Sequence, residues 1–178
     1  MVQCLYRCLV IRKALFGSFL AAFWFLGGPA PRADDVSDGD AAYHNGDYSK
    51  AKKLLLPQAK RGNAVAERDI GMMYFSGNGF ARDSRKAVRW FALSARQGQI
   101  AAQVDLGIAY ATGEGVEPNP VQAYVWFNAA ASQHPGIKTV AAEYRDHIAR
   151  KFSPDQLQMA QRIAARCQAT NYEDCGVE

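Results

Sequence analysis

The stretch AQVDLGIAYATGEGV, residues 102–116, repeats the pattern of an earlier stretch, AERDIGMMYFSGNGF, residues 66–80. Six positions keep the same residue type at one constant offset of 36 residues. These retained pairs are Ala66 and Ala102, Asp69 and Asp105, Gly71 and Gly107, Tyr74 and Tyr110, Gly77 and Gly113, and Gly79 and Gly115. A single offset over so many positions indicates a repeated structural unit.

The repeat extends to three consecutive 36-residue blocks, residues 48–83, 84–119 and 120–155. The first two blocks share ten identical residues in 36 aligned positions without a gap. A period in this range, with helical patterning inside it, is typical of solenoids built from helix pairs. The sequence therefore predicts an all-α fold, an α-solenoid of helix-turn-helix repeats.

Each block begins with an amphipathic helix. In the second block Ala87, Trp90, Phe91 and Ala95 recur at the spacing of one buried stripe, and Trp126 is the equivalent of Trp90 in the third block. Small residues alternate with large ones along this stripe. Alanine lets a neighbouring helix approach while the aromatic pair fills the space beside it.

A second helix follows in each block, and a glycine-rich turn ends it. In the second block this helix is expected to reach about Tyr110, with Gly113 and Gly115 forming the exit. Gly107 lowers helix propensity by about 1 kcal/mol relative to alanine, so we expect it to permit close approach of the paired helix. The predicted repeat core comprises Ala87, Trp90, Phe91, Gly107, Tyr110, Gly113, Gly115 and Trp126.

The segment AVRWFALSARQGQIAAQVDLGIAYATGEGVEPN, residues 87–119, resembles the Sel1-like repeat family, a relative of the tetratricopeptide repeat. The family motif has an alanine three residues before a large residue, then AAxQG, then AxxxLGxxYxxGxGVxxD. A looser form precedes it, so that the resemblance covers residues of about 48–133. It implies an α-solenoid used for protein–protein contact, without an active site of its own.

The segments before and after the repeats depart from the repeat pattern, as is typical of segments that cap the ends of a solenoid. Residues 34–47 are acidic and suggest a partial capping helix, and the repeats proper are expected to occupy residues 48–151 (48–83, 84–119 and 120–151). Residues 152–178 then predict a carboxyl-terminal capping helix, opened by a capping box of Ser153 and Gln156.

Two cysteines, Cys167 and Cys175, lie eight residues apart in this carboxyl-terminal segment. In an exported chain such a pair indicates a disulfide that closes the tail. The competing interpretation is half of a metal site. It lacks a nearby histidine or a third cysteine, so no metal and no cofactor are expected.

The first 33 residues have the order of a secretory signal peptide: basic residues, an apolar run over 14–26, and small residues up to 33. The run has 13 residues, whereas a permanent membrane helix needs about 20. The prediction is a periplasmic or secreted protein, and the alternative is a retained membrane anchor that faces the periplasm.

The leader also explains the basic charge of the whole chain. Residues 1–33 hold four basic and no acidic side chains, so residues 34–178 hold 17 of each. The isoelectric point near 8.9 is therefore no evidence for nucleic-acid binding.

Sequence motifs for catalysis are almost absent. The histidines His44, His134 and His147 lack ligand spacing, and no GxSxG, HExxH or phosphate-binding loop occurs. Residues 49–52, SKAK, match S-x-x-K, but no companion S-D-N or K-T-G element follows. We therefore expect no enzyme. The alternative is a small hydrolase or β-lactam-binding protein like the Cys-rich Sel1-like relatives.

Charge is concentrated in the middle of the chain. Residues 48–96 hold eleven bases and three acids, and within them Lys53 is equivalent to Arg89 and Lys60 to Arg96. Stacked repeats would place these pairs in two short rungs on the first-helix side. They can be an ordinary solvated face, or a groove for an acidic partner segment such as the chain's own amino terminus.

These features favour an exported helical-repeat adaptor of the cell envelope that binds another protein. A secreted effector that binds a host protein is the further alternative.

Overall fold

The computed structural model describes residues 34–133 and 139–176, so the expected leader (1–33) and His134 lie outside the described residues. Within those two ranges the chain forms eight helices and no strands, which confirms the all-α prediction. They are α1 (Asp34–His44), α2 (Tyr48–Ala59), α3 (Ala64–Ser76), α4 (Ser84–Arg96), α5 (Ile100–Thr112), α6 (Pro120–Ser132), α7 (Val140–Ala149) and α8 (Pro154–Ala169). Over the same ranges, none is long and apolar enough to cross a membrane.

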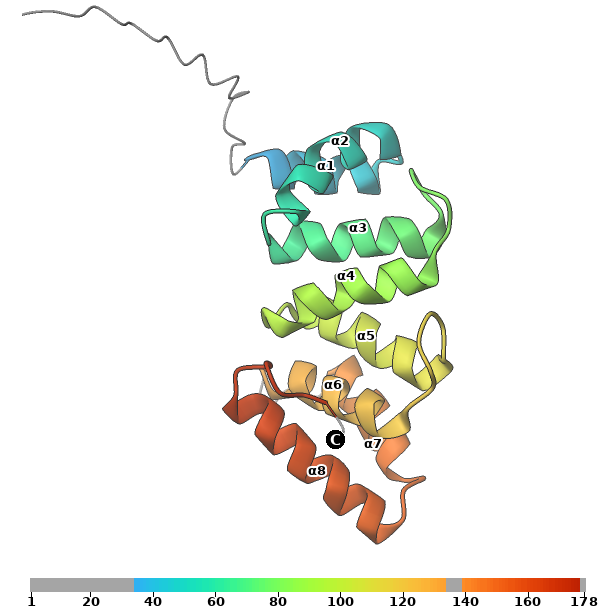
Figure 1. The fold of residues 1–178 in the computed structure, drawn as a ribbon, viewed down its shortest axis with the longest axis vertical. Coiled ribbons are helices and arrows are strands. Elements are labelled where there is room, and N and C mark those ends of the chain that lie inside the picture. The colour runs from blue at the N-terminus through green and yellow to red at the C-terminus, as the bar shows by residue number, and fades with distance from the viewer. Residues whose placement is uncertain (1–33, 134–138, 177–178) are drawn as a thin grey trace, which may run out of the picture. The chain divides into compact units, whose positions relative to one another are not determined.

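From α1 to α7, each helix packs against its neighbours in the chain, so that the hairpins stack in sequence order (Figure 1). The exception is α8, which packs against α6. This arrangement confirms the α-solenoid, and α8 covers one side of the last repeat.

Polar side chains cap the helices at equivalent positions of the repeat. Asp83 caps α4 and Asn119 caps α6, and each accepts a hydrogen bond from the backbone N–H three residues later at 3.0 Å. At the start of α8, the Ser153 hydroxyl and the Gln156 amide form the reciprocal bonds of a capping box. The caps satisfy N–H groups that have no partner inside the helix.

The second helices run two residues beyond the tyrosines expected to end them. They end at Ser76 and Thr112, and Gly77 and Gly113 follow as left-handed caps with φ of 81° and 78°. Glycine adopts this conformation without the clash that a side chain would cause. The turn then brings Phe80 back to stack on Tyr74, with ring centroids 4.2 Å apart.

The glycine inside each second helix allows an aromatic ring to approach the helix backbone. A Cβ atom added at Gly71 would lie 2.6 Å from the ring of Phe91, and one at Gly107 would lie 2.7 Å from the ring of Phe127. These rings belong to α4 and α6, the first helices of the following blocks. The expected partner was the first helix of the same block, so the glycines serve the junction between hairpins instead.

The buried side chains form two larger clusters. The amino-terminal cluster joins α1, α2 and α3, and the second cluster joins α4, α5, α6 and α8. Trp90 is half-buried and packs against the amino-terminal cluster, whereas Trp126 is 4% exposed within the second. Ala87 and Phe91 are buried, and Tyr110 is half-buried.

The carboxyl-terminal tail after α8 folds back and is linked to this helix. The Cα atoms of Cys167 and Cys175 lie 4.4 Å apart with their sulfurs bonded, and both residues belong to the second cluster. Arg166 also holds the tail, with Nε 3.0 Å from an Asp174 carboxylate oxygen. The preceding helix α7 ends at Ala149, two residues before the predicted limit.

Candidate interaction surface

The four basic residues singled out from the sequence lie on two first helices. Lys53 lies on α2, Lys60 is its C-cap residue, and Arg89 and Arg96 lie on α4. All four side chains are exposed. Each pair keeps equivalent repeat positions, because the helices repeat with the same period as the sequence.

The same four cations lack partners within the described part of the chain. None of them forms an ion pair or a side-chain hydrogen bond there. Other bases of the same repeats are engaged: Arg68 pairs with Asp105 at 2.9 Å, Arg82 with Glu114 at 2.5 Å, and Lys86 with Asp83 at 3.1 Å. Lys50, Arg61 and Arg85 are also exposed and form no ion pair among the described residues. The four cations differ from these three because they form two pairs at equivalent repeat positions, and their charge is free to meet an external anion.

The third repeat does not continue this basic surface. Its residues equivalent to Arg89 and Arg96 are Val125 and Ser132. Val125 is fully buried and shares a cluster with Ala160 and Ile163 of α8. The capping helix thus lies over α6 at the position equivalent to Arg89, whereas Ser132, the equivalent of Arg96, is exposed and uncharged.

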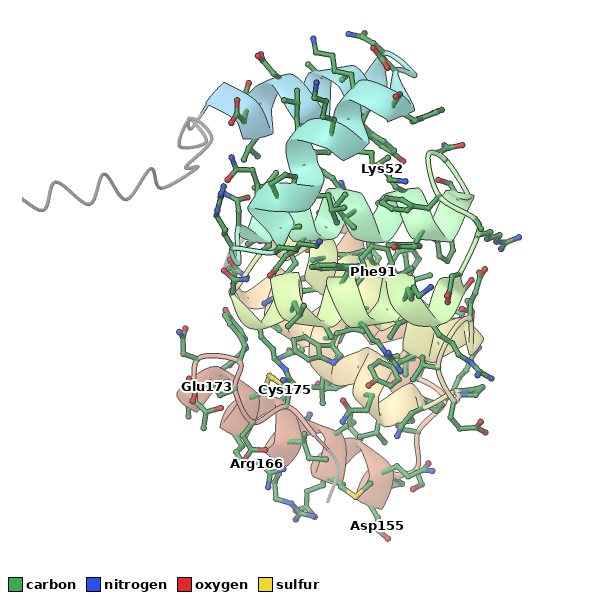
Figure 2. The ribbon with its side chains drawn as sticks, turned by 45° about the horizontal axis from the view of Figure 1, so that its top comes forward. Lys52, Phe91, Asp155, Arg166, Glu173 and Cys175 are labelled. Carbon is green, nitrogen blue, oxygen red and sulfur yellow. A yellow bond between two sulfur atoms is a disulfide. The ribbon has the colours of Figure 1, made fainter. Side chains whose placement is uncertain are left out.

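The tail reaches the edge of the basic surface. Arg96 lines a cavity of about 100 Å³ together with Glu173, Cys175 and Gly176. Tyr172 lies close to the turn after α4, because a Cβ added at Gly98 would be 3.2 Å from its ring. Figure 2 shows Glu173 and Cys175 between α8 and α4. An acidic tail residue therefore lines the same cavity as one of the four cations, without an ion pair between the two.

Asp69 and Asp105, the aspartates retained in the repeat, lie on the second helices α3 and α5. They belong to a charged cluster for which the sequence analysis predicted no role. Arg68 bridges Asp69 and Asp105, with nitrogen–oxygen distances of 3.7 Å and 2.9 Å. Asp69 is 2% exposed, and burial together with the nearby Asp40 carboxylate raises the pKa of Asp69 to about 6. The pKa of Asp105 is also raised by burial, although its bond to Arg68 opposes the shift.

A second repeated contact links neighbouring hairpins. Gln97 donates a hydrogen bond to the Glu67 carboxylate at 2.6 Å, and 36 residues later Gln133 donates to the side-chain amide oxygen of Gln103 at 2.9 Å. The acceptors are buried, Glu67 at 3% exposure and Gln103 at 0%. The glutamines at equivalent positions, Gln97 and Gln133, could have indicated this contact from the sequence. The acceptors Glu67 and Gln103 differ in residue type, so the sequence alone did not reveal the pair.

The residues considered for catalysis have structural contacts. His44 Nε2 lies 3.2 Å from an Asp40 oxygen on the same helix. Lys52 of the S-x-x-K match donates to the Gly79 carbonyl at 3.2 Å and lies over the Phe80 ring at 4.2 Å. Within residues 34–133 and 139–176, no group of three or more histidine, cysteine or acidic residues is placed to hold a metal.

Comparison with known proteins identifies the repeat. The Sel1 repeat family matches residues 64–99 and 100–135. Each match starts at a second helix and includes the first helix of the next block, so it is phased half a repeat from the blocks above. It joins α3 to α4 and α5 to α6, the junctions where Gly71 and Gly107 receive the aromatic rings.

Solved structures agree with this match. A protective antigen present in uropathogenic Escherichia coli, which displays an SLR fold, is 27% identical with a TM-score of 0.71, and the match covers 78% of this chain and 31% of the antigen. A Sel1 repeat protein from Oxalobacter formigenes is 26% identical with a TM-score of 0.58, over 81% of this chain and 59% of that protein.

No curated protein sequence matched the chain. The chain spans about a third of the length of the antigen and about three fifths of the Oxalobacter protein. The chain thus contains two Sel1 repeats and shares the helical-repeat fold of these solved structures, and Sel1-repeat proteins generally act as scaffolds for protein–protein contact.

Proposed function

We propose that the chain is an exported helical-repeat adaptor that binds an acidic segment of a partner protein through Lys53, Lys60, Arg89 and Arg96. The observation that carries the proposal is that these four exposed cations lie at equivalent positions of two successive first helices and have no partner among the described residues, whereas Arg68, Arg82 and Lys86 are paired. Complementary charge of this kind directs specificity and association rate.

The arrangement of the ends supports a defined surface over an ordinary solvated helix face. In the third repeat one equivalent position, Val125, is buried with α8 and the other, Ser132, carries no charge, so the basic surface is limited to α2 and α4. At its edge the tail residue Glu173 shares a cavity with Arg96. A segment of chain that carries an acidic residue can therefore lie at the edge of this surface.

Export is part of the proposal. The chain begins with the predicted signal peptide, and its described tail holds two cysteines at disulfide distance. Such bonds persist in oxidising compartments such as the periplasm and are rare in the cytosol. The partner is therefore sought in the cell envelope.

The experiment compares partner capture by charge-reversed variants of the mature protein. Lys53→Glu combined with Arg89→Glu removes one basic rung, and both positions are exposed. Arg150→Glu combined with Arg162→Glu is the matched control, since it makes the same charge change at exposed positions outside α2 and α4. Each protein is cross-linked in intact envelopes, and captured proteins are quantified by mass spectrometry, with circular dichroism to check folding.

We expect a defined set of proteins with acidic segments to fall at least tenfold with the first variant and to persist with the control. An equal loss in both variants would indicate general charge attraction. Unchanged capture by the first variant would refute the role of the basic rung.

A further inference from the structure

In the first two repeats, the second glycine of the turn packs against the start of the first helix of the same block. A Cβ added at Gly79 would lie 3.2 Å from the carbonyl oxygen of Tyr48. One added at Gly115 would overlap the carbonyl oxygen of Ser84 and lie 3.0 Å from the backbone nitrogen of Arg85. Close packing at this edge of the solenoid therefore depends on the absence of a side chain.

The third repeat has no such glycine. The residue 36 positions after Gly115 is Lys151, and the residue 36 positions after Ser84 is Pro120. Lys151 therefore has a side chain where the first two repeats need a glycine for the close contact. A groove of about 460 Å³ lies at this junction, between the ends of α5 and α7 and the starts of α6 and α8.

The lining of this groove has an apolar floor and a basic rim. Val121, Ile148 and Phe152 are half-buried apolar residues that pack against the second cluster. The remaining lining residues are Ala111, Pro120, His147, Lys151 and Gln156, and none of the eight is acidic. A ligand that complements this lining has an apolar body and a negative charge.

The size of the groove selects a small ligand. Small-molecule sites are mostly apolar concavities of roughly 300–1,000 Å³ with a few polar groups that fix orientation. The geometry points to a binding site for a small aliphatic monocarboxylate, with its chain on Val121, Ile148 and Phe152 and its carboxylate at Lys151. The site is separate from the basic surface of α2 and α4 and does not depend on the proposed adaptor function.

The probe is sodium octanoate, titrated into the mature protein with intact cysteines and followed by calorimetry and by backbone amide NMR shifts. Butanoate shortens the chain by four methylene groups, and octanamide keeps the length without the charge. Because each buried methylene contributes about 0.8 kcal/mol, or nearly fourfold in affinity, octanoate should bind at least tenfold more tightly than butanoate. It should also bind at least tenfold more tightly than octanamide.

Two variants at exposed positions test the location. Ala111→Trp fills the groove, and Lys151→Glu reverses the charge at its rim; each should weaken octanoate binding at least tenfold. Lys50→Glu makes the same charge change at an exposed position on α2 and should leave binding unchanged. Circular dichroism and thermal unfolding verify that each variant folds.

The results that support the carboxylate site differ from those that overturn it. Shifts confined to α5–α8, lost in both groove variants, would support the proposal. Equal binding of octanoate and octanamide, or binding that survives Ala111→Trp, would overturn it. A further arm uses N-acetyl-Gly-Leu, a peptide whose leucine carries the terminal carboxylate; binding of this peptide without octanoate would also overturn the proposal, in favour of a protein carboxyl terminus.

Discussion

Gln97 Nε2 lies 2.6 Å from a carboxylate oxygen of Glu67, and this bond ties the end of α4 to the start of α3. The next repeat keeps the geometry with Gln133 and Gln103, but there the acceptor is a neutral amide. Glu67 is 3% exposed, and burial raises the pKa of this carboxyl although the Gln97 bond opposes the shift. One repeat therefore buries a carboxyl group where the other buries an amide.

Gln97→Ala should lower the free energy of unfolding at neutral pH by about 1–3 kcal/mol, because a buried carboxylate loses its donor. Glu67→Gln should be neutral or stabilising, since it reproduces the Gln103–Gln133 pair at the equivalent position. Urea unfolding followed by circular dichroism measures both. A Gln97→Ala protein as stable as the wild type would show that the bond contributes little.

The period of 36 residues was sufficient to predict the helical solenoid, because it fixed both the apolar stripe and the turn glycines. It could not reveal which helix faces Gly71. A small residue indicates a close approach, but Phe91 of the next hairpin makes that approach only in the folded stack. The Gln97–Glu67 bond was missed for a related reason: Glu67 and Gln103 differ in type, although they accept the same contact.

The exposure of Lys53 and Arg89 followed from helical periodicity, whereas their lack of ionic partners depends on where other helices place their acids. The groove beside Lys151 was also hidden in the sequence. The loss of a repeat glycine at that position signals a departure from the turn, but not the space that opens between Pro120 and Phe152. Such features follow from the packing of segments that are distant in the chain.

Asp69→Asn should stabilise the protein at neutral pH and flatten its stability between about pH 4 and 6. Asp69 has a pKa of about 6 in the folded state against 3.8 ordinarily, so the folded state binds more protons in this window. The protonated carboxyl stabilises the folded state below about pH 4, and this contribution is lost as the pH rises from about 4 to 6. The loss in the free energy of unfolding is up to about 3 kcal/mol. Asparagine has no charge to bury, so the variant should gain about 1–3 kcal/mol at pH 7 and almost nothing at pH 4.

The measurement for this prediction is urea unfolding at half-unit steps from pH 4 to 7.5. Asp83→Asn is the matched control, because asparagine still caps α4. Its hydrogen bond from the Lys86 backbone N–H lowers the pKa of Asp83 from its ordinary 3.8, so its contribution to stability is lost only below about pH 4 and Asp83→Asn should leave the scanned profile unchanged. An Asp69→Asn protein with an unchanged pH profile would contradict the raised pKa.

Gly71→Ala should destabilise the protein although alanine favours helices. The added Cβ would lie 2.6 Å from the Phe91 ring and 3.3 Å from the Ala87 carbonyl oxygen. Overpacking of this kind costs roughly 1–3 kcal/mol, and the gain in helix propensity of about 1 kcal/mol offsets only part of it. Gly71→Ala with Phe91→Leu should lose less than the sum of the single changes in urea unfolding. Simple additivity would mean that the methyl group and the ring do not compete for space.

The bond between Cys167 and Cys175 should stabilise the tail more than it stabilises the repeats. Closing a loop of eight residues contributes about 2.5 kcal/mol in the chain-entropy model, so Cys175→Ser should lower the free energy of unfolding by about 2–3 kcal/mol. Hydrogen exchange should increase first at the backbone N–H groups of Tyr172 and Asp174, which bond to Cys167 and Thr170. Reduced wild-type protein is the control and should match the variant, since both lack the covalent link. Faster exchange spread evenly over α1–α3 would instead place the effect outside the tail, because those helices form a separate buried cluster.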